Sequence, residues 1–300
     1  MPTVTLPNDP TLDALSDEAA RLREHVSEYS LVDAQAEVAR AHGFEDWAAV
    51  GRYFAVVDAR RWEPGSPPPA AEPAAHRFLR LACLTYTDDD GPQRWSEAGR
   101  LLAGHSVTDD IWAASAAADA PAVARLLSDD PGLATRTGGP YGWMPLCYLA
   151  YSRVRPGAAD PVLSARLLLE AGAEVNEGYL WHGLPTPFTV LAGVFGEGEQ
   201  GPGREPRHPR SRELASLLLA AGADPNDGQA LYNRMFGTDD DHLELLLPAG
   251  LGTGDGGPWR QLLGAATDSP AELVAKQLAW AAAHGRHARL ELFARYGFTR

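Results

Sequence analysis

Apolar residues recur at three- and four-residue spacing along residues 1–62, with polar residues between them. This is the period of amphipathic helices that bury one face. Glycine favours the left-handed conformation in which many helices end, and acidic residues suit the positive end of a helix dipole. The pattern therefore predicts an N-terminal helical segment, with helices over 13–29, over 31–42 ending before Gly43, and over a third stretch opened by Glu45 and Asp46.

The stretch EPGSPPPAAEP at 63–73 interrupts this pattern, and five of its residues are proline. Proline has no amide hydrogen to donate, and proline-rich segments favour an extended spacer. We therefore predict a proline-rich linker that separates the N-terminal helices from the rest of the chain. After it the helical period returns, which predicts a helical capping unit over 74–107 and an all-α remainder over 108–300 without strands.

One pattern is repeated along that remainder. The segment LLLEAGAEVNEG at 167–178 returns almost unchanged as LLLAAGADPNDG at 217–228, and fainter copies surround both. Each copy is a leucine-rich helix end, a glycine and a turn of small residues, and proline opens the helices expected before them at 144–152 and 186–196. A unit of this size cannot bury its apolar face alone, so the pattern predicts a stack of helical repeats.

The pairing of a TPLHLAA-like first helix with an LLLxxGADxN-like second helix resembles the ankyrin repeat. The resemblance covers roughly residues 108–300 and is most specific at TPF and LLLAAGADPND. Thr189 and Cys147 stand where the repeat usually has histidine, and the turn glycines 172, 222, 250 and 297 are unequally spaced. The chain is thus similar to bacterial, actinobacterial-like ankyrin repeat proteins, which implies an irregular ankyrin-like solenoid after the N-terminal segment.

Composition and charge narrow the classes of function. The formal net charge of −14 disfavours nucleic acid as a partner, because phosphate binding depends on Lys and Arg. Lys276 is the only lysine, which removes most Schiff-base and phosphate-loop chemistry. Two isolated cysteines, Cys83 and Cys147, together with no export signal and no long apolar run, predict a cytoplasmic protein without a membrane segment.

Catalytic and metal-binding signatures do not accompany the repeats. The sequence lacks a nucleophile elbow, a phosphate loop and a dinucleotide fingerprint. The acidic runs 88–91 and 239–241 lack the spaced ligands of a calcium loop, so they are expected to be solvated turns and helix caps. His284 and His287 lie at a turn without a partner ligand, which disfavours zinc. We therefore expect no enzyme, no cofactor and no metal, while an enzyme site between the N-terminal segment and the stack stays open as a weaker alternative.

Recognition of a protein partner is the function that remains. Ankyrin-like stacks bind through their projecting turns and the concave face of their first helices, and here the turns would carry Tyr141, Trp143, Tyr179, Trp181 and His182. Tryptophan and tyrosine dominate binding hot spots, so these residues are the first candidates for an interface. The alternative for Trp143 and Trp181 is that they pack on a neighbouring turn.

Two further segments are candidates for binding. The insertion 196–210 carries Arg204 and Arg207 in an otherwise acidic chain, and arginine suits bidentate contacts with carboxylate or phosphate. Small-molecule or phosphate sensing through this loop is the alternative function, and a tolerated surface loop is the plainer interpretation. The last helix carries Leu292, Phe293 and Tyr296, which predicts that the array continues or that self-association covers the helix.

Overall fold

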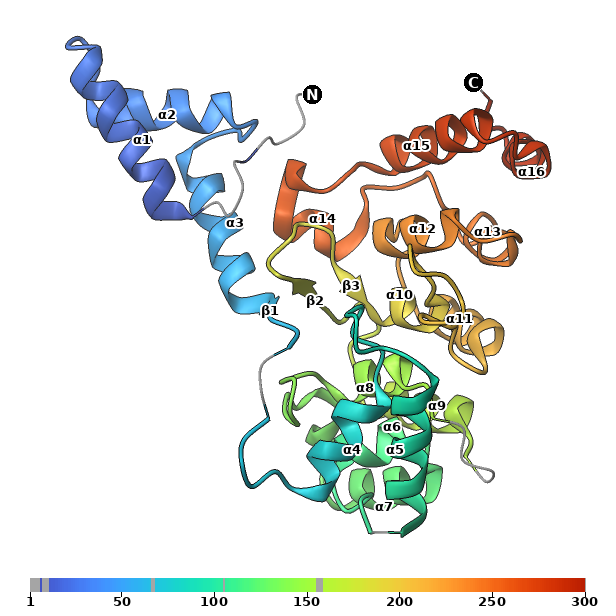
Figure 1. Ribbon diagram of the computed structural model, residues 1–300. Helices are drawn as coiled ribbons and strands as arrows, with labels where there is room; N and C mark the ends of the chain where they lie inside the picture. The colour runs from blue at the N-terminus through green and yellow to red at the C-terminus, as the bar shows by residue number, and fades with distance from the viewer. Residues whose placement is uncertain (1–5, 7–10, 66–67, 105, 155–158, 300) are drawn as a thin grey trace.

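The computed structural model describes residues 6, 11–65, 68–104, 106–154 and 159–299 (Figure 1), and most of them lie in helices. The prediction of an all-α class is confirmed in that helices dominate the described residues. The N-terminal part contains α1 (Leu12–His25), α2 (Leu31–Ala41), α3 (Trp47–Arg60) and β1 (Arg61–Trp62). The next part contains α4 (Ala74–Ala82), α5 (Pro92–Gly104), α6 (Ile111–Ala116), α7 (Ala120–Asp129), the 3₁₀ helix η1 (Pro131–Thr135), α8 (Pro145–Tyr151) and α9 (Pro161–Glu170).

The second half of the chain begins with a short hairpin and continues in helices. It contains β2 (Gly178–Trp181), β3 (Phe188–Thr189), α10 (Val190–Phe195), α11 (Ser211–Ala220), α12 (Gly228–Met235), α13 (Asp241–Leu246), α14 (Gly257–Leu263), the 3₁₀ helix η2 (Gly264–Ala266), α15 (Pro270–Ala283) and α16 (His287–Arg295).

The three predicted N-terminal helices are present, and local chemistry sets where they begin. Ser30 and Asp33 form a capping box at the start of α2, and the Asp46 side chain accepts a hydrogen bond from a backbone amide of α3. Gly43 follows α2 with φ 86°, the left-handed conformation expected from the sequence. The first helix ends at His25, earlier than predicted.

From α6 onward the helices alternate between two layers. Helices α6, α8, α10, α12 and α15 pack one on the next in that order, and α7, α9, α11 and α13 do the same beside them (Figure 1). Helix α4 packs on both α5 and α6, so this pair covers the first end of the stack. Successive pairs thereby bury one another's apolar faces, as the repeated pattern requires.

The two copies of the repeated segment make the same contact. The Asn176 side chain donates to the carbonyl of Gly222 at 3.1 Å and accepts from an amide of the same 222–224 turn at 2.8 Å. Asn226, at the matching place in the second copy, donates to the 252–253 turn at 3.1 Å and accepts from it at 2.8 Å. Each asparagine therefore joins its own turn to the next one along the stack.

Strands appear where the sequence predicted none. Strands β2 and β3 form an antiparallel hairpin, and β1 pairs in parallel with β2. The first repeat copy leads into β2 at Gly178, whereas the second leads into α12 at Gly228. An added Cβ at Gly178 would lie 2.7 Å from the Phe188 carbonyl oxygen, so glycine is needed for the close approach of β3. The helix predicted from 186 consequently begins only at Val190, with Thr189 as its cap.

The N-terminal helices pack on the rest of the molecule through a core of their own. Side chains of α1–α3 surround Leu180 from β2 together with Trp259 and Leu263 from α14. The Arg60 guanidinium donates to both carboxylate oxygens of the buried Glu177, at 2.9 and 3.0 Å. The described part of the predicted linker, which excludes residues 66 and 67, has no helix or strand, but it does not isolate the N-terminal helices as the sequence had suggested.

Candidate functional site

The aromatic residues predicted to project from turns are mostly turned inward. Trp143 and Tyr179 are buried, and their rings stack at 4.6 Å with an interplanar angle of 9°. Trp62 from β1 packs against both of them, at 5.0 and 4.9 Å between ring centroids. Tyr141 is half-buried against Trp143 at 4.7 Å. These rings form one cluster, so the placement of Tyr179 on an exposed turn was wrong, and for Trp143 the structure agrees with the alternative of packing within the chain.

Two hydroxyl groups beside this cluster, those of Tyr148 and Tyr151, are satisfied within the chain. The Tyr148 hydroxyl donates to the Gly138 carbonyl and accepts from the Tyr141 amide, both at 2.9 Å. The Tyr151 hydroxyl donates to the Thr189 carbonyl at 2.9 Å. Burial raises the pKa of Tyr141 above its usual value. A buried ring whose polar end is already bonded serves packing, which is the role of Tyr148 and Tyr151. In the described part of the chain, the buried Tyr179 hydroxyl and Trp143 indole N–H have no hydrogen-bond partner.

Trp181 and His182, at the end of β2, are only partly available. The Trp181 ring is half-buried, and its indole N–H donates to the Thr85 carbonyl at 3.2 Å. His182 is exposed, and its Nδ1 lies 2.5 Å from a carboxylate oxygen of Glu63. Hydrogen bonding from Arg61, and secondarily from His182, holds the pKa of Glu63 below its usual range. His182 is therefore the one predicted turn residue whose ring faces solvent.

The arginines of the insertion 196–210 make contacts inside the molecule. Arg207 forms ion pairs with Glu197 at 2.6 Å, Asp241 at 2.6 Å and Asp239 at 2.5 Å. Arg204 donates to the backbone carbonyl of Asp88. Three carboxylates thus already surround the guanidinium of Arg207.

The acidic run 239–241 lies at the start of α13, with the exposed Asp239 before the N-cap residue Asp240, and it also forms an ion-pair network. The fully buried Arg234 lies 2.7 Å from Asp239 and 2.9 Å from Asp241, and Arg289 lies 2.6 Å from Asp240. Arg234 lies on α12 and Arg289 on α16, so each of the three carboxylates pairs with an arginine from a helix other than α13. Sequence spacing could not show this, because ion pairs between elements depend on the tertiary fold.

The other acidic run, 88–91, is also partly internal. The buried Asp90 accepts from the amides of Thr85 at 2.9 Å and Thr87 at 3.2 Å, and it pairs with Arg94 at 2.7 Å. Burial raises its pKa from the usual value, while Arg94 opposes that shift. Asp90 therefore fixes the turn before α5.

Sequence reasoning missed an exposed row of aromatic rings on α12 and α15. Tyr232 and Phe236 are each 42% exposed and contact edge to face at 5.2 Å. Phe236 contacts the half-buried Trp280 at 6.3 Å, and Trp280 stacks on the exposed His284 at 4.2 Å. We call these four residues the aromatic row. Helical spacing of Tyr232 with Phe236 and of Trp280 with His284 was visible in the sequence, but not that the two pairs meet.

We call the layer formed by α6, α8, α10, α12 and α15 the first-helix layer. The aromatic row lies on the part of this layer that is exposed to solvent. All residues of α8 and α10 are buried, and in α6 only Trp112 is not. Helices α6, α8 and α10 therefore expose almost no side chains to a partner. Helices α12 and α15 continue this layer and keep large apolar side chains at the surface.

The apolar residues of the last helix are covered by the chain itself. Leu292 and Phe293 are buried, and Phe293 contacts Phe298 at 6.2 Å. Tyr296 alone among the three predicted residues is exposed. The apolar face that suggested self-association through α16 is thus largely satisfied within one chain.

Two further kinds of site are absent from the described part of the chain. No group of three or more His, Cys, Asp or Glu side chains there is arranged to hold a metal ion. No helix in the same residues combines the length and apolar character needed to cross a membrane. No protein-family model matches the chain, nor does any curated protein or solved structure.

Proposed function

We propose that this chain is a non-catalytic protein–protein interaction scaffold built from irregular ankyrin-like repeats and acting in the cytoplasm. Support for the repeats comes from the two alternating helix layers and from the matching contacts of Asn176 and Asn226 between successive turns. Support for the absence of catalysis comes only from the sequence, which lacks the signatures of the common catalytic sites.

We propose that recognition uses the aromatic row, in place of the turns that carry Trp143 and Tyr179. The observation that carries this proposal is that Tyr232 and Phe236 are large, adjacent and each 42% exposed on the open part of the first-helix layer. Aromatic side chains bury much area at a small loss of conformational freedom, so they suit the centre of an interface. The partner would present apolar side chains to this row.

The alternative of phosphate sensing through the insertion 196–210 has less support. Arg207 is neutralised by Glu197, Asp239 and Asp241, and an incoming phosphate would have to compete with all three. The cost of separating such pairs disfavours an anion site at this loop.

Affinity capture with quantitative mass spectrometry tests the proposed surface. The wild type is compared with the double variant Tyr232→Ala/Phe236→Ala and with Leu163→Ala, whose side chain is 43% exposed on α9 in the other layer. Truncating a hot spot costs about 2 kcal/mol or more of binding free energy. The affinity for a specific partner should therefore fall roughly thirtyfold in the double variant, and the captured amount should fall with it. Leu163→Ala should retain it, and circular dichroism should show all three proteins equally helical.

Equal capture by the wild type and by the folded double variant would contradict the proposal. Loss of the partner from Leu163→Ala as well would assign binding to general apolar adhesion. In either case the aromatic row would no longer be the recognition surface.

A further inference from the structure

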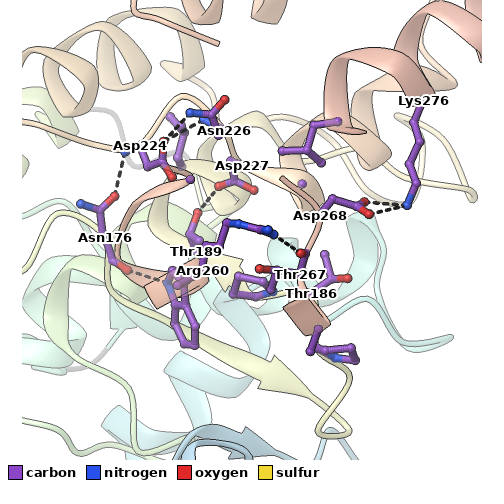
Figure 2. Close-up of a pocket in the computed structure, with 18 residues that line it drawn as sticks. Asn176, Thr186, Thr189, Asp224, Asn226, Asp227, Arg260, Thr267, Asp268 and Lys276 are labelled. Carbon is purple, nitrogen blue, oxygen red and sulfur yellow. Dashed lines mark hydrogen bonds and ion pairs between the residues drawn. The ribbon is translucent and has the colours of Figure 1, made fainter. Parts of the chain in front are cut away.

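A cavity of about 190 Å³ lies between the β2–β3 hairpin, the start of α12 and the segment from α14 to α15 (Figure 2). We call it the hairpin pocket. Its volume corresponds to roughly six water molecules, enough for a compact organic molecule. Its apolar walls come from the hairpin and the flanking helices and are formed by Pro185, Pro187, Leu191, Trp259 and Leu273. The polar groups therefore decide what the pocket can hold.

Asp227 is a buried anion in this pocket without a cation beside it. Its side chain is 6% exposed, and one oxygen accepts from the Ala230 amide at 2.9 Å as the cap of α12. The other oxygen accepts from the Thr189 hydroxyl. Both donors are neutral, and within the described ranges Asp227 forms no ion pair. A carboxylate removed from water without a counter-charge is unfavourable, and burial raises its pKa to about 6.

A second carboxylate increases the negative charge of the same wall. Asp224 lines the hairpin pocket and accepts from the amide and the side chain of Asn226, both at 3.0 Å. These donors are neutral as well. A protonated amine entering the pocket would meet the fields of both Asp227 and Asp224.

Arg260 is the complementary case on the facing element. It lines the pocket from α14, and its Nη1 donates to the neutral carbonyl of Thr267. Among the described residues no carboxylate forms an ion pair with it. The remaining guanidinium donors form the planar fork that binds carboxylates.

The other cation of the pocket is already paired. Lys276 contacts both carboxylate oxygens of Asp268, at 2.7 and 2.6 Å, as Figure 2 shows. The hairpin pocket therefore holds one neutralised pair, Lys276 with Asp268, beside two carboxylates, Asp227 and Asp224, and one guanidinium, Arg260, that form no ion pair among the described residues.

We propose that the hairpin pocket binds a small zwitterion, with its protonated amine on Asp227 and its carboxylate on Arg260. Such a molecule supplies the missing charge to each wall at once and adds no net charge to the site. The chemical class is a short amino acid, because the cavity is small and its remaining surface is apolar. This site is separate from the aromatic row and does not depend on the proposed scaffold function.

Isothermal calorimetry on the purified full chain tests the site. The probes are glycine, 3-aminopropionate and 4-aminobutyrate, with butylamine and butyrate as controls that carry one charge each. We expect at least one zwitterion to bind ten times more tightly than either control. Its affinity should fall below pH 6, where Asp227 takes up a proton and no longer attracts the amine.

Three variants assign the roles of the charged residues. Asp227→Asn keeps an oxygen that can cap α12 and should lower the affinity for the zwitterion at least tenfold at pH 7.5. The affinity of this variant should not fall further below pH 6. Arg260→Gln should lower the affinity for the zwitterion by a similar factor. Lys276→Gln should change the affinity by less than threefold, because Lys276 is already paired.

Several results would overturn the proposal. No heat from any zwitterion at millimolar concentration would exclude the class, and butyrate or butylamine binding as tightly as the zwitterions would show that one charge suffices. Unchanged affinity in a folded Asp227→Asn variant would remove Asp227 from the site. The variant Tyr232→Ala/Phe236→Ala should bind the zwitterion like the wild type, so failure of the scaffold proposal would leave this test intact.

Discussion

At the scale of single residues, Asp227 affects stability as well as binding. Burial is the main cause that raises the pKa of its carboxyl from 3.8 to about 6. Between those values the folded chain holds a proton that the unfolded chain has released. Folded molecules then bind more protons than unfolded ones, so the contribution of Asp227 to the free energy of unfolding falls as pH rises from about 4 to about 6.

The variant Asp227→Asn should remove this pH dependence while keeping the helix cap. Relative to the wild type, its free energy of unfolding should increase by about 2 kcal/mol between pH 4 and pH 7, since one pKa unit corresponds to about 1.4 kcal/mol and part of the change already lies below pH 4. Urea unfolding of both proteins at the two pH values measures this difference, and other titrating groups cancel in the comparison. A difference independent of pH would show that Asp227 ionises with an ordinary pKa.

At the scale of elements, sequence predicts best what local contacts decide. The N-terminal helices follow from apolar period and capping residues, and α8 follows from the proline at its start; these signals act within a few positions. The hairpin could not be predicted in this way, because nearly identical segments precede β2 and α12. What differs is the tertiary partner, since β2 pairs with β1 from the distant N-terminal part. A local pattern does not contain that information.

The asparagines at matching places in the two repeat copies offer a test at this scale. Asn226→Ala removes one donor and one acceptor that join its turn to the 252–253 turn. We expect a loss of about 1–3 kcal/mol in the free energy of unfolding, because backbone groups of that turn lose their partners. Asn176→Ala should cost a similar amount. Chemical denaturation measures both, and a negligible effect of either would show that water replaces these contacts.

At the scale of the whole molecule, the candidate sites were predicted by residue type but not by position. Sequence identified Trp143 and Tyr179 as large aromatics near turns, yet long-range packing on Trp62 buries them. It also identified Arg207 as a cation in an acidic chain, but its carboxylate partners on and beside α13 meet it only in the folded state. Amphipathic spacing shows on which face of a helix a residue lies, and the complete fold decides whether that face is exposed to solvent.

The second core, which joins α1–α3 to β2 and α14, provides the last prediction. Leu263 is 2% exposed in that core, whereas its neighbour Leu262 is 44% exposed on the same helix. Leu263→Ala leaves a cavity and should cost about 2–5 kcal/mol locally, while Leu262→Ala should be nearly neutral. Because α1–α3 pack on α14 and β2 through this core, we expect hydrogen exchange of α1–α3 amides to accelerate in Leu263→Ala. Helices α8 and α10 belong to the other core and should keep their protection. Uniform acceleration across both cores would show instead that the chain unfolds as one cooperative unit.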